Sequence, residues 1–187
     1  MINKYNITQG FTLVETLVAI LILTMALAGP IAIAEGDLHA TLIAKDQITA
    51  YYLAQDAIEY VRSVRDSNNL SGNSSNATWL TGLSSCINAN VGGTAQCTID
   101  SLNATVAACP TGGCPILNYD SVTNGGYFNY NAGSASIFTR TVSILTPVPI
   151  PSGSNPFEAV VTVKVSWNDT ARITRSVQVQ ENLFNWE

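Results

Sequence analysis

Hydrophobic residues are concentrated in the first part of the chain. Residues 11–34 contain 18 apolar side chains out of 24, and Glu15 is the only charged residue among them. As an α-helix this run would extend about 36 Å, which is enough to cross a hydrocarbon core of about 30 Å. We therefore expect a membrane-spanning helix with one unexplained carboxylate, because a charge inside a membrane costs a few kcal/mol or more.

The helix is expected to continue to about residue 67, but residues 35–67 are amphipathic rather than uniformly apolar. Polar Asp56, Glu59, Arg62 and Asp66 lie mostly on one side of this half. The opposite face repeats at spacings of three and four, as a buried helix face does: Tyr51, Ala54, Ala57, Ile58, Val61 and Val64.

Gly29 and Pro30 interrupt the apolar half of the predicted helix. Proline removes a backbone donor and crowds the preceding turn, so we expect a helix break or kink at this pair. Two interpretations stay open at this point. The pair is either a tolerated break in a membrane helix or a segment that melts during assembly.

The last third of the chain alternates between apolar and polar residues with a period of two, which is typical of strands with one buried face. The first such strand has Phe138, Arg140, Val142 and Ile144 on one face, and the second has Val161, Val163, Val165 and Trp167. A third has Ile173, Val177 and Val179. A proline-rich stretch, residues 147–156, connects the first two strands, and a turn at Asn168-Asp169-Thr170 connects the last two.

Residues 68–136 are rich in Asn, Ser, Thr and Gly, and we interpret them as loops and short elements that lie over a core formed elsewhere. Aromatic residues in the loop at 119–130 would cover the sheet, with an adhesive tip as the alternative. The apolar stripe of the helix is the obvious cover for an antiparallel sheet. The fold class is therefore α+β, with a globular head at residues 68–187.

The charge distribution excludes several classes of function. The net charge is −5, and residues 68–187 contain six acidic and four basic residues. We therefore predict no broad basic surface and no binding of a specific nucleic acid. The chain has one histidine, no nucleophile elbow and no phosphate-binding glycine loop. We predict no enzyme activity, no cofactor and no metal site.

Four cysteines, Cys86, Cys97, Cys109 and Cys114, all lie in the predicted head. An even number in an exported domain indicates two disulfides, whereas the spacing and the single histidine fit a zinc site poorly. Three pairings are possible, of which loop closure favours Cys86–Cys97 with Cys109–Cys114.

Lys4 before the span, with Glu35 and Asp37 after it, favours a cytoplasmic N terminus and an external head.

The stretch Gly10-Phe11-Thr12-Leu13-Val14-Glu15 resembles the signature of type IV prepilins and type II secretion pseudopilins. The resemblance implies a type IV pilin-like fold and a leader, residues 1–10, which a prepilin peptidase removes between Gly10 and Phe11 before methylating the amine of Phe11. Glu15 would then pair with the Phe11 amine of a neighbouring subunit and set the register of a filament. Residues 51–66 look most like a minor pilin or pseudopilin.

The resemblance also implies partners and a location. The partners are the peptidase, other subunits contacted through residues 11–34, an inner-membrane assembly platform and membrane lipid. The chain would begin as a single-pass protein of the cytoplasmic membrane and end in a pilus or pseudopilus. Three alternatives stay open: a secretory signal cut after Ala26-Leu27-Ala28, a plain single-span anchor, and a membrane-tethered binding or adhesin domain that never polymerises.

Overall fold

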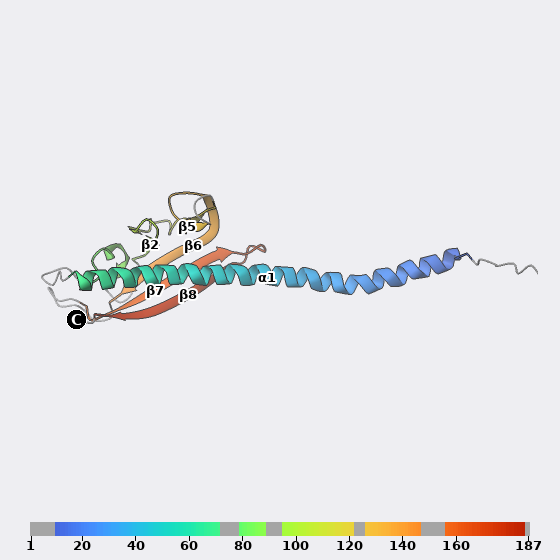
Figure 1. The fold of residues 1–187 in the computed structure, drawn as a ribbon, viewed down its shortest axis with the longest axis horizontal. Helices are drawn as coiled ribbons and strands as arrows, with labels where there is room; N and C mark the ends of the chain where they lie inside the picture. Colours follow the sequence, from blue (N-terminus) through green and yellow to red (C-terminus); the bar gives the residue numbers. More distant parts are fainter. Residues whose placement is uncertain (1–9, 72–78, 89–94, 122–125, 147–155, 186–187) are drawn as a thin grey trace, which may run out of the picture. The chain divides into compact units, whose positions relative to one another are not determined.

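A computed structural model describes residues 10–71, 79–88, 95–121, 126–146 and 156–185. Leader residues 1–9, including Lys4, and most of the proline-rich connection, residues 147–155, lie outside this described part. The chain divides into two compact units, residues 1–44 and 45–187. One helix, α1 (Leu13–Leu70), contributes residues to both units (Figure 1).

In the first unit α1 has no packing partner among the described residues. Its large apolar side chains are exposed, including Phe11 at 82% and Met25 at 70%. α1 stays helical through Gly29 and Pro30, so the helix is not interrupted there, while the kink expected at this pair stays a prediction. A run of apolar side chains on both sides keeps the backbone in its own hydrogen bonds, and one proline removes only one donor from that ladder.

In the second unit eight strands form one sheet within the described residues. Their bounds are β1 (Ile87–Asn88), β2 (Cys97–Asp100), β3 (Thr105–Ala108), β4 (Ile116–Asp120), β5 (Tyr127–Asn129), β6 (Ser134–Leu145), β7 (Glu158–Asn168) and β8 (Thr174–Phe184), with a short 3-10 helix, Ser84–Cys86, before β1. The α+β class and the antiparallel C-terminal strands are confirmed, and only β1 pairs in parallel.

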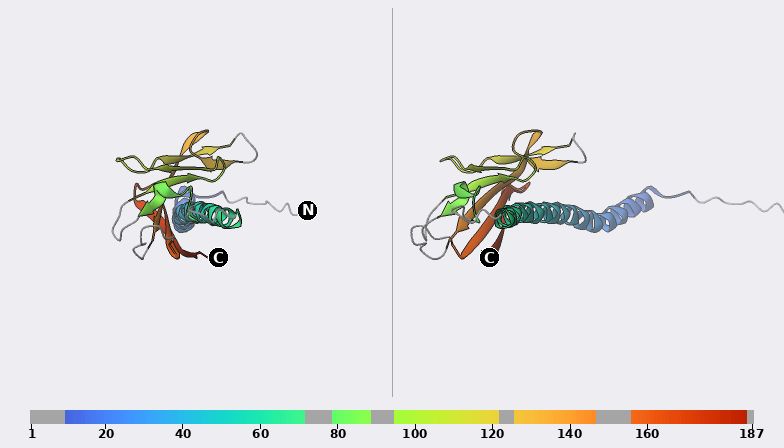
Figure 2. Two further views of the ribbon diagram at one scale, coloured as in Figure 1. Left: turned by 90° about the vertical axis from the view of Figure 1, so that its left-hand side faces the viewer. Right: turned by 60° about the vertical axis from the view of Figure 1, so that its left-hand side comes forward.

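β6 is the central strand of the sheet. One of its edges pairs with β7, which pairs with β8, while β2 and β4 pair along β6 and carry β3 and β5. The strands lie around the C-terminal half of α1, with β7 and β8 on one side of it in Figure 2. The short elements expected within residues 68–136 are the five strands β1 to β5, which join the sheet itself rather than only lying over a core formed elsewhere.

The core lies between α1 and the sheet. Its helix side consists of Ala50, Leu53, Ala54, Ala57, Ile58 and Val61, so the predicted stripe is confirmed from Ala54 to Val61. Tyr51 is 46% exposed and Val64 only half-buried. Three fully buried alanines allow α1 to approach the strands closely, and Tyr51 points away from them.

Both strands that face α1 show the predicted alternation. Phe138, Val142 and Ile144 of β6 are buried, as are Val161, Val163, Val165 and Trp167 of β7. Aromatic residues of the 119–130 segment join this core, since Phe128 contacts Phe138 and Phe138 contacts Trp167 with ring centroids 5.9 Å apart in each pair. These rings act as a cover over the sheet.

The two disulfides pair neighbours in sequence, as loop closure favours. Cys86–Cys97 lies in the core with both residues fully buried, whereas Cys109–Cys114 is half-buried and closes a short loop after β3.

We expect Cys86→Ala with Cys97→Ala to lower the free energy of unfolding of the head by about 3 kcal/mol or more, and Cys109→Ala with Cys114→Ala by about 2 kcal/mol, because shorter loops save less entropy. Urea denaturation in detergent, followed by the fluorescence of buried Trp79 and Trp167, measures both. Equal losses would contradict a core role for the first pair.

Candidate functional site

The predicted processing and register residues, Gly10, Phe11 and Glu15, lie together at the start of α1. Thr12 precedes the first helical residue, and its hydroxyl oxygen accepts a hydrogen bond of 3.2 Å from the Glu15 N–H. The Thr12 carbonyl accepts the first helical bond, from Thr16 N–H, also at 3.2 Å. Thr12 is therefore the N-cap, and Thr12-x-x-Glu15 has the spacing of a capping box.

This geometry gives Glu15 two favourable features in the first turn of α1. Its carboxylate lies where exposed backbone N–H groups and the helix dipole favour negative charge. Its backbone N–H is already satisfied by Thr12, so the carboxylate itself stays available to an external cation. In the described residues no cation pairs with Glu15.

Gly10 is not required by the fold. A side chain added at this position would contact nothing within 4 Å, and the residue does not have the positive φ that favours glycine. A glycine that the structure does not need is consistent with recognition by another protein. Phe11, which follows it, is almost fully exposed.

The hydroxyl groups within the apolar half are satisfied inside the helix. Thr16 Oγ1 donates to the Leu13 carbonyl at 2.8 Å, and Thr24 Oγ1 donates to the Leu21 carbonyl at 2.9 Å. Thr12, by contrast, accepts a bond through its hydroxyl oxygen. Among the described residues, α1 is the one helix long and apolar enough to cross a membrane.

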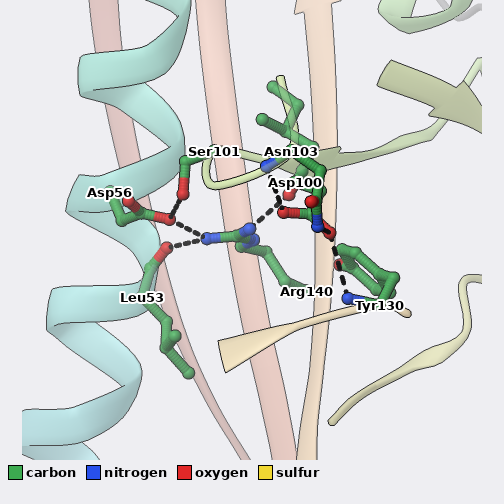
Figure 3. A network of polar contacts seen from close by, with 8 residues as sticks. Leu53, Asp56, Asp100, Ser101, Asn103, Tyr130 and Arg140 are labelled. Atoms are coloured by element: carbon green, nitrogen blue, oxygen red, sulfur yellow. Dashed lines mark hydrogen bonds and ion pairs between the residues drawn. The ribbon is translucent and has the colours of Figure 1, made fainter. Parts of the chain in front are cut away.

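A second polar centre lies in the head. The sequence indicated that Arg140 is on a buried strand face but did not indicate its partners. Arg140 of β6 is buried, 1% exposed, and its guanidinium reaches the helix (Figure 3). Nη1 donates to the Leu53 carbonyl at 2.9 Å and to Asp56 Oδ2 at 2.7 Å, and Nη2 donates to the Ile99 carbonyl. The same Asp56 oxygen accepts a bond of 2.8 Å from Ser101. One side chain thus joins α1, β6 and the β2 end.

The alternation of β6 placed Arg140 on the buried face, and a buried guanidinium needs an anion. Asp56 was assigned to the polar face of the helix, and it does stay 43% exposed by its side chain. The sequence analysis did not use the fact that Asp56 borders the buried stripe of α1. A carboxylate at this position can contact Arg140 in the head and still remain in contact with water.

Asp100 and Tyr130 lie beside the guanidinium. Burial alone would raise the pKa of the Asp100 carboxyl, but hydrogen bonds from Asn103 and from the Tyr130 N–H, together with the charge of Arg140, hold that pKa below its ordinary value. Burial raises the pKa of the Tyr130 hydroxyl. At neutral pH the Asp100 carboxyl is therefore ionised and the Tyr130 hydroxyl is neutral.

A metal site in the described residues would require at least three ligating side chains close together. No group of three His, Cys, Asp or Glu residues there could hold a metal ion. The four cysteines are all in disulfides. The N-terminal motif is therefore the candidate functional site, and the Arg140 network is what fixes the helix to the head.

Comparison with known proteins supports this assignment. The family model "Prokaryotic N-terminal methylation motif" matches residues 6–29, which contain the capped helix start and half of the exposed apolar helix. No curated protein and no solved structure matches the chain. The chain thus carries, at residues 6–29, the methylation motif that is the signature of prepilins.

Proposed function

We propose that this protein is a structural subunit, a pilin or pseudopilin, of a type IV pilus or a type II secretion-like filament. A prepilin peptidase would cut between Gly10 and Phe11 and methylate the new amine. The mature helix would then anchor the chain in the membrane and later in the filament. A minor rank remains our prediction, drawn from the pattern of residues 51–66.

One observation carries the proposal: the methylation motif begins a helix that has an unpartnered apolar half and a half built into a folded head. The first half offers exposed apolar side chains for lipid and later for other helices. The second half is part of the core of the head, so separating it from the head would expose the buried side chains of Ala50, Leu53 and Val61. A chain organised in this way suits a filament whose centre is helical.

Residue chemistry at the cut supports the same sequence of events. Gly10 offers the peptidase a position without a side chain, and a Cβ added there would meet no other atom within 4 Å. Hydrolysis turns a neutral amide into a cationic amine on Phe11. Glu15 of a neighbouring copy can neutralise this amine, and two opposite charges buried together cost less than either alone.

Mass spectrometry of the purified filaments and of the membrane fraction tests the proposal. We expect an N terminus at methylated Phe11 in both fractions, with the amount in filaments giving the rank of the subunit. An N terminus at Gly29 would identify a secretory signal, and an intact Met1 would identify a plain anchor. A mature chain found in membranes but never in filaments would favour the tethered binding domain.

A further inference from the structure

A groove runs along one flank of α1 in the head. It encloses about 660 Å³ and is bordered on the helix by Thr49, Tyr52 and Asp56, and across from the helix by Leu102, Tyr127 and Phe128. Tyr52 and Leu102 are more than half exposed, at 65% and 56%. The groove is therefore open to solvent and is lined by aromatic and apolar side chains together with the carboxylate of Asp56.

The groove is suited to a cation. Asp56 uses Oδ2 for Arg140 and Ser101, whereas its Oδ1 accepts no bond from the described residues. Tyrosine and phenylalanine rings beside a carboxylate attract a guanidinium through charge and through their faces.

An exposed cation lies at the turn between β7 and β8. The turn between β7 and β8 is held by Asp169, whose Oδ1 accepts bonds from the N–H groups of Ala171 and Ile173, both at 2.9 Å. Its Oδ2 accepts one from Arg175, at 2.9 Å. This framework holds Arg172 at φ +61°, a conformation that is uncommon for a residue with a side chain. Arg172 is exposed, has no ion-pair partner among the described residues, and adjoins Ile173, which is 56% exposed.

The two features lie on opposite flanks because α1 contacts different strands on its two sides. Arg62 forms an ion pair with Glu181 of β8 on one flank, and Asp56 contacts Ser101 after β2 on the other. β8 begins at Thr174, about 23 Å from Glu181 by strand rise, and Thr49 lies about 20 Å along α1 from Arg62. The turn and the groove therefore lie on the same side of the Arg62–Glu181 contact, toward residue 45 (Figure 1).

We propose that the Arg172 turn of one copy docks in the Tyr52–Asp56 groove of a second copy. This inference rests on the proposed function, because copies anchored in one membrane point the same way and can bring opposite flanks together. Such a contact is heterologous and does not close on itself, and it needs no more than two adjacent copies, as a minor rank requires. The guanidinium would meet the free Asp56 oxygen and the Tyr52 ring, while Ile173 covers Leu102.

Cysteine cross-linking between two differently tagged full-length copies tests the contact. One copy carries Thr49→Cys and the other Arg172→Cys, so that any disulfide between the tags joins two molecules. The control pairs Thr49→Cys with Lys164→Cys, an exposed cation on β7 away from the turn. We expect several-fold more dimer with the Arg172 variant, in membranes and in filaments alike.

Equal dimer yields from the two pairs, or a cross-link to a different protein only, would overturn the proposal. Charge reversal gives a second measurement that needs no new cysteine. Arg172→Glu is expected to reduce incorporation into filaments several-fold, whereas Lys164→Glu leaves it unchanged, and equal effects would count against the groove. Absence of the wild-type chain from filaments would refute the proposed function. The cross-links measured in membranes would still decide whether this contact forms.

Discussion

Glu15→Ala is expected to leave membrane insertion and cleavage intact and to reduce incorporation into filaments tenfold or more. Alanine retains the backbone N–H that bonds to Thr12, so the start of α1 is preserved. What is lost is the anion that would neutralise the Phe11 amine of a neighbour inside an apolar bundle. Immunoblots of sheared filaments and of membranes, made from the same cells, give the ratio directly.

Three variants separate charge from shape and from helix capping. Glu15→Gln keeps the size of the side chain and should be as defective as alanine. Thr12→Val removes the oxygen that caps α1 and should have a smaller effect, because the helix is long. Glu35→Ala removes another acid of α1, beyond the apolar run, and should behave as wild type. Normal incorporation of Glu15→Ala would refute the register role.

Arg140→Leu should lower the free energy of unfolding of the head by about 3 kcal/mol, because it removes one partner of a buried ion pair and strips the Ile99 carbonyl of its donor. Asp56 remains partly hydrated in the variant, which keeps the loss at the lower end for a broken buried pair. Urea denaturation followed by tryptophan fluorescence measures the change.

Lys164→Leu is the matched control, since Lys164 pairs with Thr141 in the neighbouring strand and its side chain is exposed. It should change stability by less than about 0.5 kcal/mol. The double variant Arg140→Leu with Asp56→Leu should cost less than the sum of the single changes, because it leaves no charge without a partner. An Arg140→Leu protein as stable as the Lys164 control would show that the network contributes little.

The sequence predicted those elements whose signal is local. The buried faces of β6 and β7 followed from strict alternation over many residues, and the helix stripe followed from spacing between Ala54 and Val61. Strands β1 to β5 were missed because they are two to five residues long and lie among Asn, Ser, Thr and Gly. At that length an apolar pattern cannot be distinguished from a loop, and the pairing with β6 is what makes them strands.

The candidate sites differ in the same way. Gly10, Phe11 and Glu15 are close in sequence, so the motif could be recognised without a structure. Arg140 and Asp56 are 84 residues apart, and no local pattern connects them. Pro30 is also a strong local signal, but α1 stays helical across it, because one proline removes only one donor from the helical hydrogen bonds.

The capped start of α1 has a consequence for how assembly could be switched on. In the cleaved form proposed here, Thr12 becomes the second residue, so the new cation stands directly before a turn whose free N–H groups carry partial positive charge. Like charges would then meet at the tip of every unassembled subunit. Cleavage would thus place the new amine in an unfavourable electrostatic environment. The carboxylate of a neighbouring subunit would neutralise this amine without any change in the fold.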